Sequence, residues 1–138
     1  MPRVRITRRL HFCAAHRLAR EDWSEEENRR VFGDCANPNW HGHNYDLEVT
    51  VAGPVDPETG YVMDLGALKA LVNRLVVDEL DHSNLNLDVP WLDGIIPSTE
   101  NLAVAIWERI VGHIPGPAAL DKVVLWETPR QWAEYRGE

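Results

Sequence analysis

Residues 35–44 read CANPNWHGHN, and this short stretch holds one thiol and two imidazoles. His41 and His43 are two residues apart, so on a β-strand both side chains point to the same face, with their backbones roughly 7 Å apart. Imidazole nitrogens are common zinc ligands, and a catalytic zinc takes about three protein ligands and keeps one position open. The stretch therefore predicts part of a zinc site.

A third ligand must then come from a neighbouring strand. His16, which follows the small residues Ala14 and Ala15 in HFCAAHRL, is the best-placed candidate because those residues leave room beside it. His11 is an alternative, but its parity along the strand differs from that of His16, so the two are not expected to serve together. His113 lies next to a predicted helix terminus, where a histidine favours the helix dipole.

Cys35 precedes His41 by a short polar loop. A thiolate near a metal or a cationic imidazole is stabilised, so Cys35 is a candidate zinc ligand, general base or inert thiol. The spacing from Cys35 to His41 does not match the compact spacing of zinc-binding cysteines, and this favours the base. Cys13 lies in an alternating segment and is expected to pack rather than to take part in chemistry.

Carboxylates stand at two further places where they could do chemistry. Asp81 is adjacent to His82, and a carboxylate can orient an imidazole and stabilise its protonated form for proton transfer. The alternative is that His82 only complements the end of a helix. Glu127 shares parity with Val123 and Leu125, which look buried, so its carboxylate needs a partner. The amino-pyrimidinone edge of a heterocycle would supply two parallel hydrogen bonds.

The elements that must position these residues follow from hydrophobic periodicity. Four segments alternate apolar and polar side chains as half-buried strands do. They are residues 3–12, 44–53, 122–127 and 131–136, the last two forming a hairpin. Residues 19–31 are polar and predict an excursion with about one helical turn.

Two segments carry an apolar stripe at helical spacing. The first begins after Asp64, a good N-cap, and runs to Leu80. The second begins at Ser98 or Thr99, which can cap it, and Pro115 ends it. Glu100, in the first turn of this second helix, complements the helix dipole and could also touch a ligand.

The predicted order is strand, strand, helix, helix, strand, strand. An α+β fold satisfies it, with a four-stranded antiparallel sheet and two helices packed on one face. At 138 residues the chain is expected to form a single domain spanning 1–138. Such a sheet keeps two open edges, which favours oligomerisation through them.

Composition narrows the function. The formal charge of −8 argues against nucleic acid or an anionic membrane as the partner. Arginines in the N-terminal segment could bind an anion locally or discourage pairing at the sheet edge. Two cysteines are too few for a secreted disulfide scaffold, and no signal-peptide or membrane-spanning pattern is present. The cytoplasm is the expected location.

Six segments in order resemble the 6-pyruvoyl-tetrahydropterin synthase family, which also contains the 6-carboxy-tetrahydropterin synthases. They are FCAAHRL, CANPNWHGHNY, VDPETGYVMDL, LDHSNLNLDVPW, PSTEN and the late WET. The resemblance implies the tunnelling fold, in the strand and helix order given above, and a homohexamer made of two trimers. It also implies a pterin triphosphate as the small-molecule substrate.

The resemblance further implies a role for each candidate residue. Zn²⁺ would be held by His16, His41 and His43, and Cys35 would be the proton-abstracting base. Asp81 and His82 would transfer protons. The pterin would lie in a pocket between subunits, anchored and lined by Glu127, Ser98, Thr99 and Glu100. Arg17 and Lys122 are candidate contacts of the triphosphate.

The implied reaction converts 7,8-dihydroneopterin triphosphate to 6-pyruvoyl-tetrahydropterin with elimination of triphosphate, as a lyase of tetrahydrobiopterin biosynthesis. The alternative is the 6-carboxy enzyme of queuosine biosynthesis, which releases acetaldehyde. The long gap from Cys35 to His41 favours the pyruvoyl type. A non-catalytic metal- or pterin-binding module is an alternative of another class, but it would need neither Cys35 nor the Asp81–His82 pair.

The sequence departs from the family pattern at two positions. Cys13 stands where relatives often have serine or glutamate, and Trp40 stands directly before His41, where glycine is common in the pyruvoyl enzymes. The bulky ring of Trp40 is expected to reshape the roof of the pocket and so to affect the choice of substrate.

Overall fold

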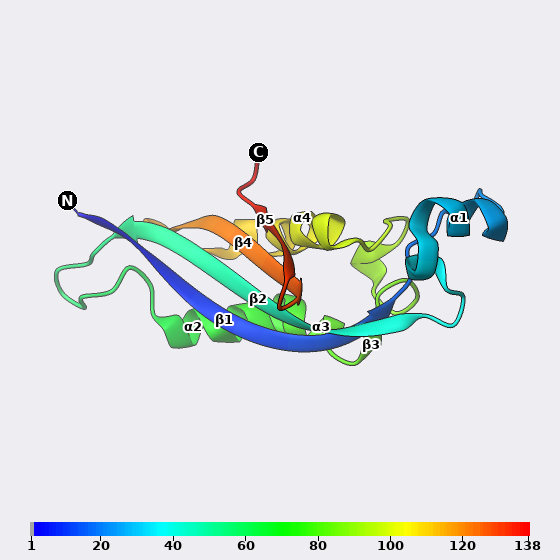
Figure 1. Cartoon of the computed structure of the whole chain (residues 1–138). Helices are drawn as coiled ribbons and strands as arrows, with labels where there is room; N and C mark the ends of the chain where they lie inside the picture. The colour runs from blue at the N-terminus through cyan, green and yellow to red at the C-terminus, as the bar shows by residue number, and fades with distance from the viewer. Residues whose placement is uncertain (1) are drawn as a thin grey trace.

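The computed structural model describes residues 2–138, which fold around one sheet in the strand order β3-β1-β2-β4-β5. The strands are β1 (Arg3–His16), β2 (His41–Pro54), β3 (Ser83–Asn84), β4 (Ala119–Thr128) and β5 (Gln131–Tyr135). The helices are α1 (Glu25–Phe32), α2 (Leu65–Val72), α3 (Asp78–Leu80) and α4 (Thr99–Ile110) (Figure 1). Short helical turns occupy Gly33–Ala36, Asn73–Val77, Pro90–Leu92 and Val111–His113.

β1 and β2 form a long antiparallel pair that organises the rest of the molecule. Their register places His16 opposite His41 and Phe12 opposite Tyr45. β4 pairs with the other side of β2, and β4 and β5 form the predicted closing hairpin. The four predicted strands are therefore present. The first two are longer than the alternation indicated, because pairing continues through the histidines to His16 and His41.

The predicted sheet of four antiparallel strands is wrong in one respect, because a fifth strand, β3, lies parallel to β1. It pairs Ser83 with Ala14 and Asn84 with Ala15. A strand of two residues has no alternation to detect, and its pairing partner is far away in the sequence. Along the rest of β1, the edge away from β2 has no strand partner among the described residues.

The two predicted helices are confirmed, together with their caps. An oxygen of Asp64 accepts a hydrogen bond from the amide of Gly66 at the start of α2. The helical path continues from α2 through a π-helical turn over Asn73–Val77 into α3, and so ends at Leu80 as expected. The hydroxyl of Ser98 accepts from the amide of Asn101 and caps α4.

The polar excursion after β1 contains more helix than expected, because α1 has eight residues. No broad apolar stripe marks it, and only Asn28 in it is buried. The helix is stabilised locally instead: Ser24 caps it, acidic side chains occupy its first turn and arginines its last, and Gly33 ends it with φ of 60°. α1 lies at the end of the molecule where β1 ends and β2 begins (Figure 1).

The core lies between one face of the sheet and the helices. Alternate residues of β1, β2 and β4, including Phe12, Tyr45 and Leu125, are buried there against side chains of α2 and α4 such as Leu68 and Ile106 (Figure 1). We call this the inner face. The intervening residues form the outer face, which is more polar and carries ion pairs such as Arg9–Asp46.

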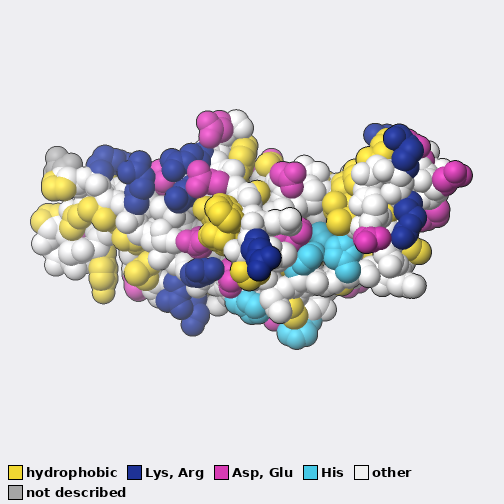
Figure 2. All heavy atoms as spheres, in the orientation of Figure 1, with side chains coloured by type: hydrophobic (Ala, Val, Ile, Leu, Met, Phe, Trp, Pro, Cys, Tyr) yellow, Lys and Arg dark blue, Asp and Glu magenta, His cyan; other side chains and the backbone are white. Residues whose placement is uncertain are grey.

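Charged side chains are spread unevenly over the surface. Figure 2 shows Lys and Arg near the N-terminal part of β1 and again over α1, with the histidines between these two regions. Among the described residues, no helix combines the length and the apolar character that crossing a membrane would require.

Candidate metal centre and active site

Three histidines meet on the inner face, at the end of the sheet next to α1. Because alternate residues share a face and His16 pairs with His41, both strands direct their imidazoles to one place. One ring nitrogen from each of His16, His41 and His43 lies within 4.8 Å of the others. The ring centroids are 4.6 to 5.1 Å apart. Three ligand atoms at this separation can surround a single metal ion.

His16 is the deepest of the three, with 1% of its surface exposed. Its Nδ1–H donates to the carbonyl oxygen of Pro97 at 2.7 Å, and the hydroxyl of Tyr45 lies 3.5 Å from the same nitrogen. A bond from Nδ1 to a carbonyl leaves Nε2 unprotonated and fixes the ring, which is the usual support of a metal-binding histidine. Pro97 directly precedes the cap of α4, so this helix and β1 together orient His16.

The electrostatics of the cluster favour neutral rings. Burial, and then the neighbouring imidazoles, lower the pKa of both His16 and His41 from its ordinary value. Nε2 of His43 is buried and, in the part of the chain that the structure describes, has no hydrogen-bond partner. A buried nitrogen without a partner is costly unless something else binds it. Neutral imidazoles with free lone pairs suit a zinc ion.

Glu127 lies beside this cluster, at the end of β4 on the inner face. Its Oε1 is 3.7 Å from Nε2 of His43. The hydroxyl of Thr99 donates to its Oε2 at 2.6 Å, so the start of α4 holds the carboxylate in place. The prediction that Glu127 faces the core side and needs a partner is confirmed. Of its predicted neighbours, Ser98 is occupied as the helix cap, and Glu100 is exposed.

Cys35 lies in the short turn after α1, at the same end of the sheet as the histidines. Its thiol is exposed, and its carbonyl accepts from the amide of Leu18 at 2.7 Å. Arg17 braces the same turn: it donates to the carbonyl of Ala36 at 2.8 Å and pairs with Glu25.

Arg17, which contacts the turn that holds Cys35, also contacts Trp40. The guanidinium of Arg17 lies over the indole of Trp40, 6.0 Å from the ring centroid. Trp40 has φ of 68°, a conformation that is strained for any residue with a side chain. The ring and the cation together order the loop that joins Cys35 to His41. Arg17 and Lys122, the candidate triphosphate contacts, are both engaged within the chain, the latter with Glu134 at 3.6 Å.

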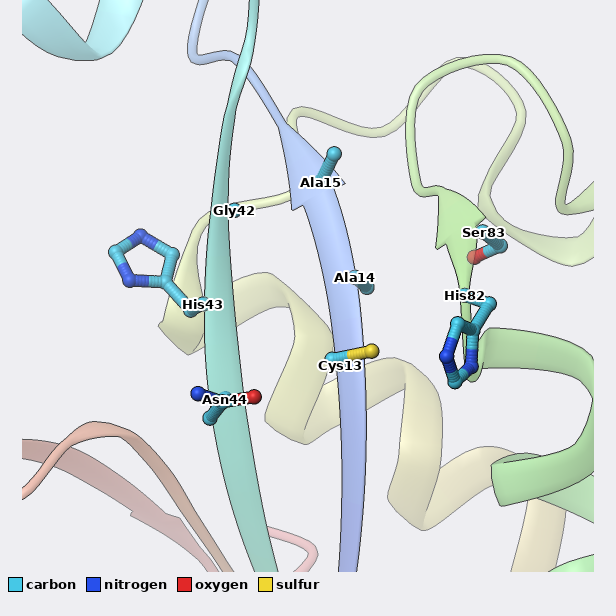
Figure 3. Close-up of a pocket in the computed structure, with 8 residues that line it drawn as sticks. All are labelled: Cys13, Ala14, Ala15, Gly42, His43, Asn44, His82 and Ser83. Atoms are coloured by element: carbon cyan, nitrogen blue, oxygen red, sulfur yellow. The ribbon is translucent and has the colours of Figure 1, made fainter.

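Asp81 and His82 lie beside the edge of β1 that faces away from β2, next to Cys13. Figure 3 shows His43 on the β2 side of the two strands, whereas Cys13 points toward His82 on the β3 side. Oδ2 of Asp81 is 3.0 Å from Nδ1 of His82, so the two adjacent side chains do form a pair. The backbone amide of Cys13 donates to Asp81, and this bond lowers the pKa of the carboxylate. Within one chain, then, this pair does not meet the three histidines.

Sequence reasoning missed several partners in the site. Cys13, which is expected to pack rather than to take part in chemistry, is half-buried and has Asp81 and His82 as neighbours instead of core residues. Cys13 and His11 are two residues apart on one strand and so share the outer face, and this spacing could have indicated that Cys13 points away from the core. Tyr45 could also have been found, since it continues the alternation of His41 and His43. The Pro97 carbonyl and the Thr99–Glu127 bond depend on tertiary packing and left no mark in the sequence.

Comparison with known proteins agrees with this geometry. The family model described as 6-pyruvoyl tetrahydropterin synthase matches residues 5–138. A human protein named 6-pyruvoyl tetrahydrobiopterin synthase is 44% identical over 135 residues, covering 98% of this chain and 92% of the human one. A Pyrococcus furiosus protein named dihydroneopterin monophosphate aldolase is 41% identical over 125 residues, 91% of this chain and 90% of its own.

The solved structure of the Caenorhabditis elegans 6-pyruvoyl tetrahydropterin synthase superimposes with a TM-score of 0.93 at 41% identity, covering 100% of this chain and 98% of that one. The match to the family model and these full-length similarities lead to one conclusion. The chain belongs to the 6-pyruvoyl tetrahydropterin synthase family, which is a family of enzymes.

Proposed function

We propose that this chain is a zinc-dependent 6-pyruvoyl tetrahydropterin synthase that converts 7,8-dihydroneopterin triphosphate to 6-pyruvoyl tetrahydropterin and triphosphate. The observation that carries the proposal is the cluster of His16, His41 and His43 beside Glu127. Metal ligands and a pterin anchor thus lie next to each other, in a chain 44% identical to a human protein named for this reaction.

The histidines are suited to hold zinc because burial lowers the pKa of His16 and His41 and because Pro97 orients His16. Zinc bound there would polarise the side-chain oxygens of the substrate and acidify the neighbouring C–H bonds. Glu127 would accept two parallel hydrogen bonds from the amino-pyrimidinone edge of the pterin. Thr99 holds that carboxylate at the required position.

Proton transfer falls to residues outside the histidine cluster. Cys35 is proposed as the base that removes a carbon-bound proton, after which triphosphate leaves by elimination. Asp81 and His82 are proposed to return protons to the ring and the side chain. The reaction is an internal redox step, since the ring is reduced as the side chain is oxidised, so it needs no external oxidant or reductant.

The separation of the two groups within one chain favours a site shared between chains. Because Asp81 and His82 lie at the edge of β1, apart from the three histidines, we propose that a second chain supplies this pair to each site. The unpaired edge of β1 and the hairpin strand β5 are the surfaces through which sheets could join. A homohexamer of two trimers is the proposed assembly. The two free thiols favour the reducing cytoplasm as its location.

A second candidate function has a specific observation in its favour, namely the relative named dihydroneopterin monophosphate aldolase. An aldol cleavage would use the same metal and pterin anchor but would break the side chain. The 6-carboxy reaction, with loss of acetaldehyde, is a third outcome. The pyruvoyl reaction keeps three side-chain carbons on the ring. The other two reactions each leave one carbon, as a carboxyl group in the carboxy reaction and as a hydroxymethyl group in the aldol cleavage.

Mass spectrometry of the products from 7,8-dihydroneopterin triphosphate separates these reactions. We expect inorganic triphosphate and a pterin that keeps its three-carbon side chain. Acetaldehyde with a carboxylated pterin would instead show the carboxy reaction. A hydroxymethyl pterin with a phosphorylated hydroxyacetaldehyde would show the aldolase. Activity should disappear on removal of metal by a chelator and return with Zn²⁺. Cys35→Ala should keep the metal and the fold but lose turnover; normal turnover in this variant would refute the assignment of the base.

A further inference from the structure

A second cluster of side chains of the metal-binding types lies at the edge of β1 that faces away from β2. Cys13 comes from β1, and Asp81 and His82 come from the turn between α3 and β3. A sulfur, a carboxylate oxygen and a ring nitrogen from these residues lie within 4.8 Å of one another. We propose that Cys13, Asp81 and His82 bind a second divalent cation of the zinc type, separate from the one at the histidine cluster.

The backbone holds these three donors together. The amide of Cys13 donates to Oδ1 of Asp81 at 2.9 Å, and the amide of His82 donates to the carbonyl of Cys13 at 2.6 Å. His82 has φ of 60°, in the left-handed region that residues other than glycine rarely adopt. The two hydrogen bonds to β1 maintain this conformation, so the donors need little rearrangement to accept an ion.

The charge state of the cluster also suits a cation. The hydrogen bond from the Cys13 amide lowers the pKa of Asp81, so this carboxylate is anionic at neutral pH. Nδ1 of His82 lies 3.0 Å from Oδ2 of Asp81, and a ring that donates from Nδ1 keeps its Nε2 lone pair free. Cys13 would lose its thiol proton to solvent as the metal–sulfur bond forms.

The cluster is open to incoming ions. Cys13 and His82 point toward one another at the edge of a cavity of about 370 Å³, which Asn44 and Ser83 also line (Figure 3). The side chain of His82 is 80% exposed, which leaves room for a water molecule as a fourth ligand. One sulfur, one nitrogen and one oxygen donor favour Zn²⁺, Co²⁺ or Cd²⁺ over Mg²⁺ or Ca²⁺.

Binding at this cluster has a consequence for catalysis, and this consequence rests on the proposed function. A cation held by Asp81 and His82 would occupy the pair that is proposed to transfer protons. Excess zinc should therefore slow turnover, and Cys13 would be the residue responsible. The binding itself does not depend on the reaction that the enzyme catalyses.

Titration with Co²⁺ tests the binding directly, because cobalt–thiolate complexes absorb in the near ultraviolet. The protein is first loaded with one equivalent of Zn²⁺ per chain and then titrated. We expect one further equivalent to bind with a thiolate band, and Cys13→Ser to abolish that band. Cys35→Ser is the matched control, which removes the other thiol and should keep the band. A wild-type protein without the band, or a band that follows Cys35, would overturn the proposal.

His82→Asn provides a second variant that leaves both thiols in place, and it should weaken Co²⁺ binding about tenfold or more. Unchanged affinity in this variant would count against the site even if Cys13→Ser failed to fold. Turnover is then compared at one equivalent and in excess Zn²⁺, each protein against its own rate. We expect the wild type to slow and Cys13→Ser to keep its rate. If excess Zn²⁺ changes the turnover of both proteins equally, the proposed inhibition through Cys13 is wrong. The Co²⁺ titration then decides whether the cluster binds a cation.

Discussion

At the scale of single residues, the histidine cluster depends on burial. His16 is almost fully enclosed and is fixed by the carbonyl of Pro97, whereas His41 and His43 are half-buried. Burial disfavours the charged form of an imidazole, so enclosure keeps the ligands neutral. The same effect makes the metal-free protein sensitive to acid.

The first prediction follows from the lowered pKa of His16 and His41. The unfolded chain, with histidine pKa values near 6.5, binds more protons than the folded one, so stability is complete above that pH and is lost below it. Urea unfolding of metal-free protein should give a lower free energy of unfolding at about pH 5.5 than at about pH 7.5. His41→Gln should reduce this dependence, and His113→Gln, at an exposed site, should not. Equal dependence in all three proteins would contradict the explanation.

The second prediction concerns Thr99, whose hydroxyl holds Glu127. Thr99→Val removes a hydrogen bond to a charged group, which is worth roughly 1.5–3 kcal/mol. If Glu127 anchors the pterin, kcat/KM should fall about tenfold to a hundredfold while zinc content stays the same. Thr99→Ser keeps the hydroxyl and should restore most of the loss. A fully active valine variant would show that the carboxylate needs no such support.

The positions of the site residues could be predicted from sequence where strand parity determines them. Parity puts His41 with His43, and Glu127 with Leu125, and the structure brings His43 and Glu127 together with His16 at the end of the first strand. The neighbours of Cys13 could not be predicted in this way. Its contact with His82 depends on where the chain returns after α3, which no local pattern contains.

At the scale of elements, α4 connects the core to the site. Its first turn carries the cap Ser98 and the Glu127 partner Thr99, and the preceding Pro97 carbonyl orients His16. One helix terminus therefore supports both His16, a proposed metal ligand, and Glu127, the proposed pterin anchor. Removing the cap of this terminus should therefore lower the free energy of unfolding.

The third prediction tests that terminus through its cap. Ser98→Ala leaves the Asn101 amide without its side-chain acceptor, which should cost about 1 kcal/mol of unfolding free energy. Denaturant unfolding of the zinc-free protein measures this loss. Ser98→Asp can still accept the bond and should lie close to the wild type. If alanine and aspartate behave alike, the cap does not contribute as described.

Elements with strong periodicity were predictable, and those defined by caps or by distant pairing were not. α2 and α4 carry apolar stripes, and their caps Asp64 and Ser98 stand where expected. α1 buries almost nothing, so its helix depends on capping and charge rather than on a stripe. β3 has two residues, and it forms a strand only through its pairing with β1, which no local pattern in its own sequence indicates.

At the scale of the whole molecule, the two groups of the proposed machinery lie apart. The inner face has the histidines and Glu127, whereas Asp81 and His82 lie at the edge of β1 next to Cys13. The proposed site therefore combines the histidines of one chain with the Asp81–His82 pair of another.

The fourth prediction is complementation between inactive variants. Cys35→Ala and His82→Asn should each lose most activity. When they are co-assembled in equal amounts, about a quarter of the sites should combine an intact Cys35 with an intact His82 from another chain. The mixture should then recover about a quarter of wild-type turnover. As the control, Cys35→Ala mixed with His41→Ala should recover nothing, because one chain supplies both residues. No gain in the first mixture would place the whole site within a single chain.

The register of β1 against β2 has a consequence for how the protein is made. Pairing His16 with His41 puts three imidazoles on the helix side, but a slip by a single residue would turn His16 outward and present Ala15 in its place. A chain with the shifted register could still bury some apolar surface, but its three histidines would no longer lie together. The proposed metal ion would then bind only chains in which β1 and β2 are paired in the native register, and its binding would stabilise that register over the shifted one.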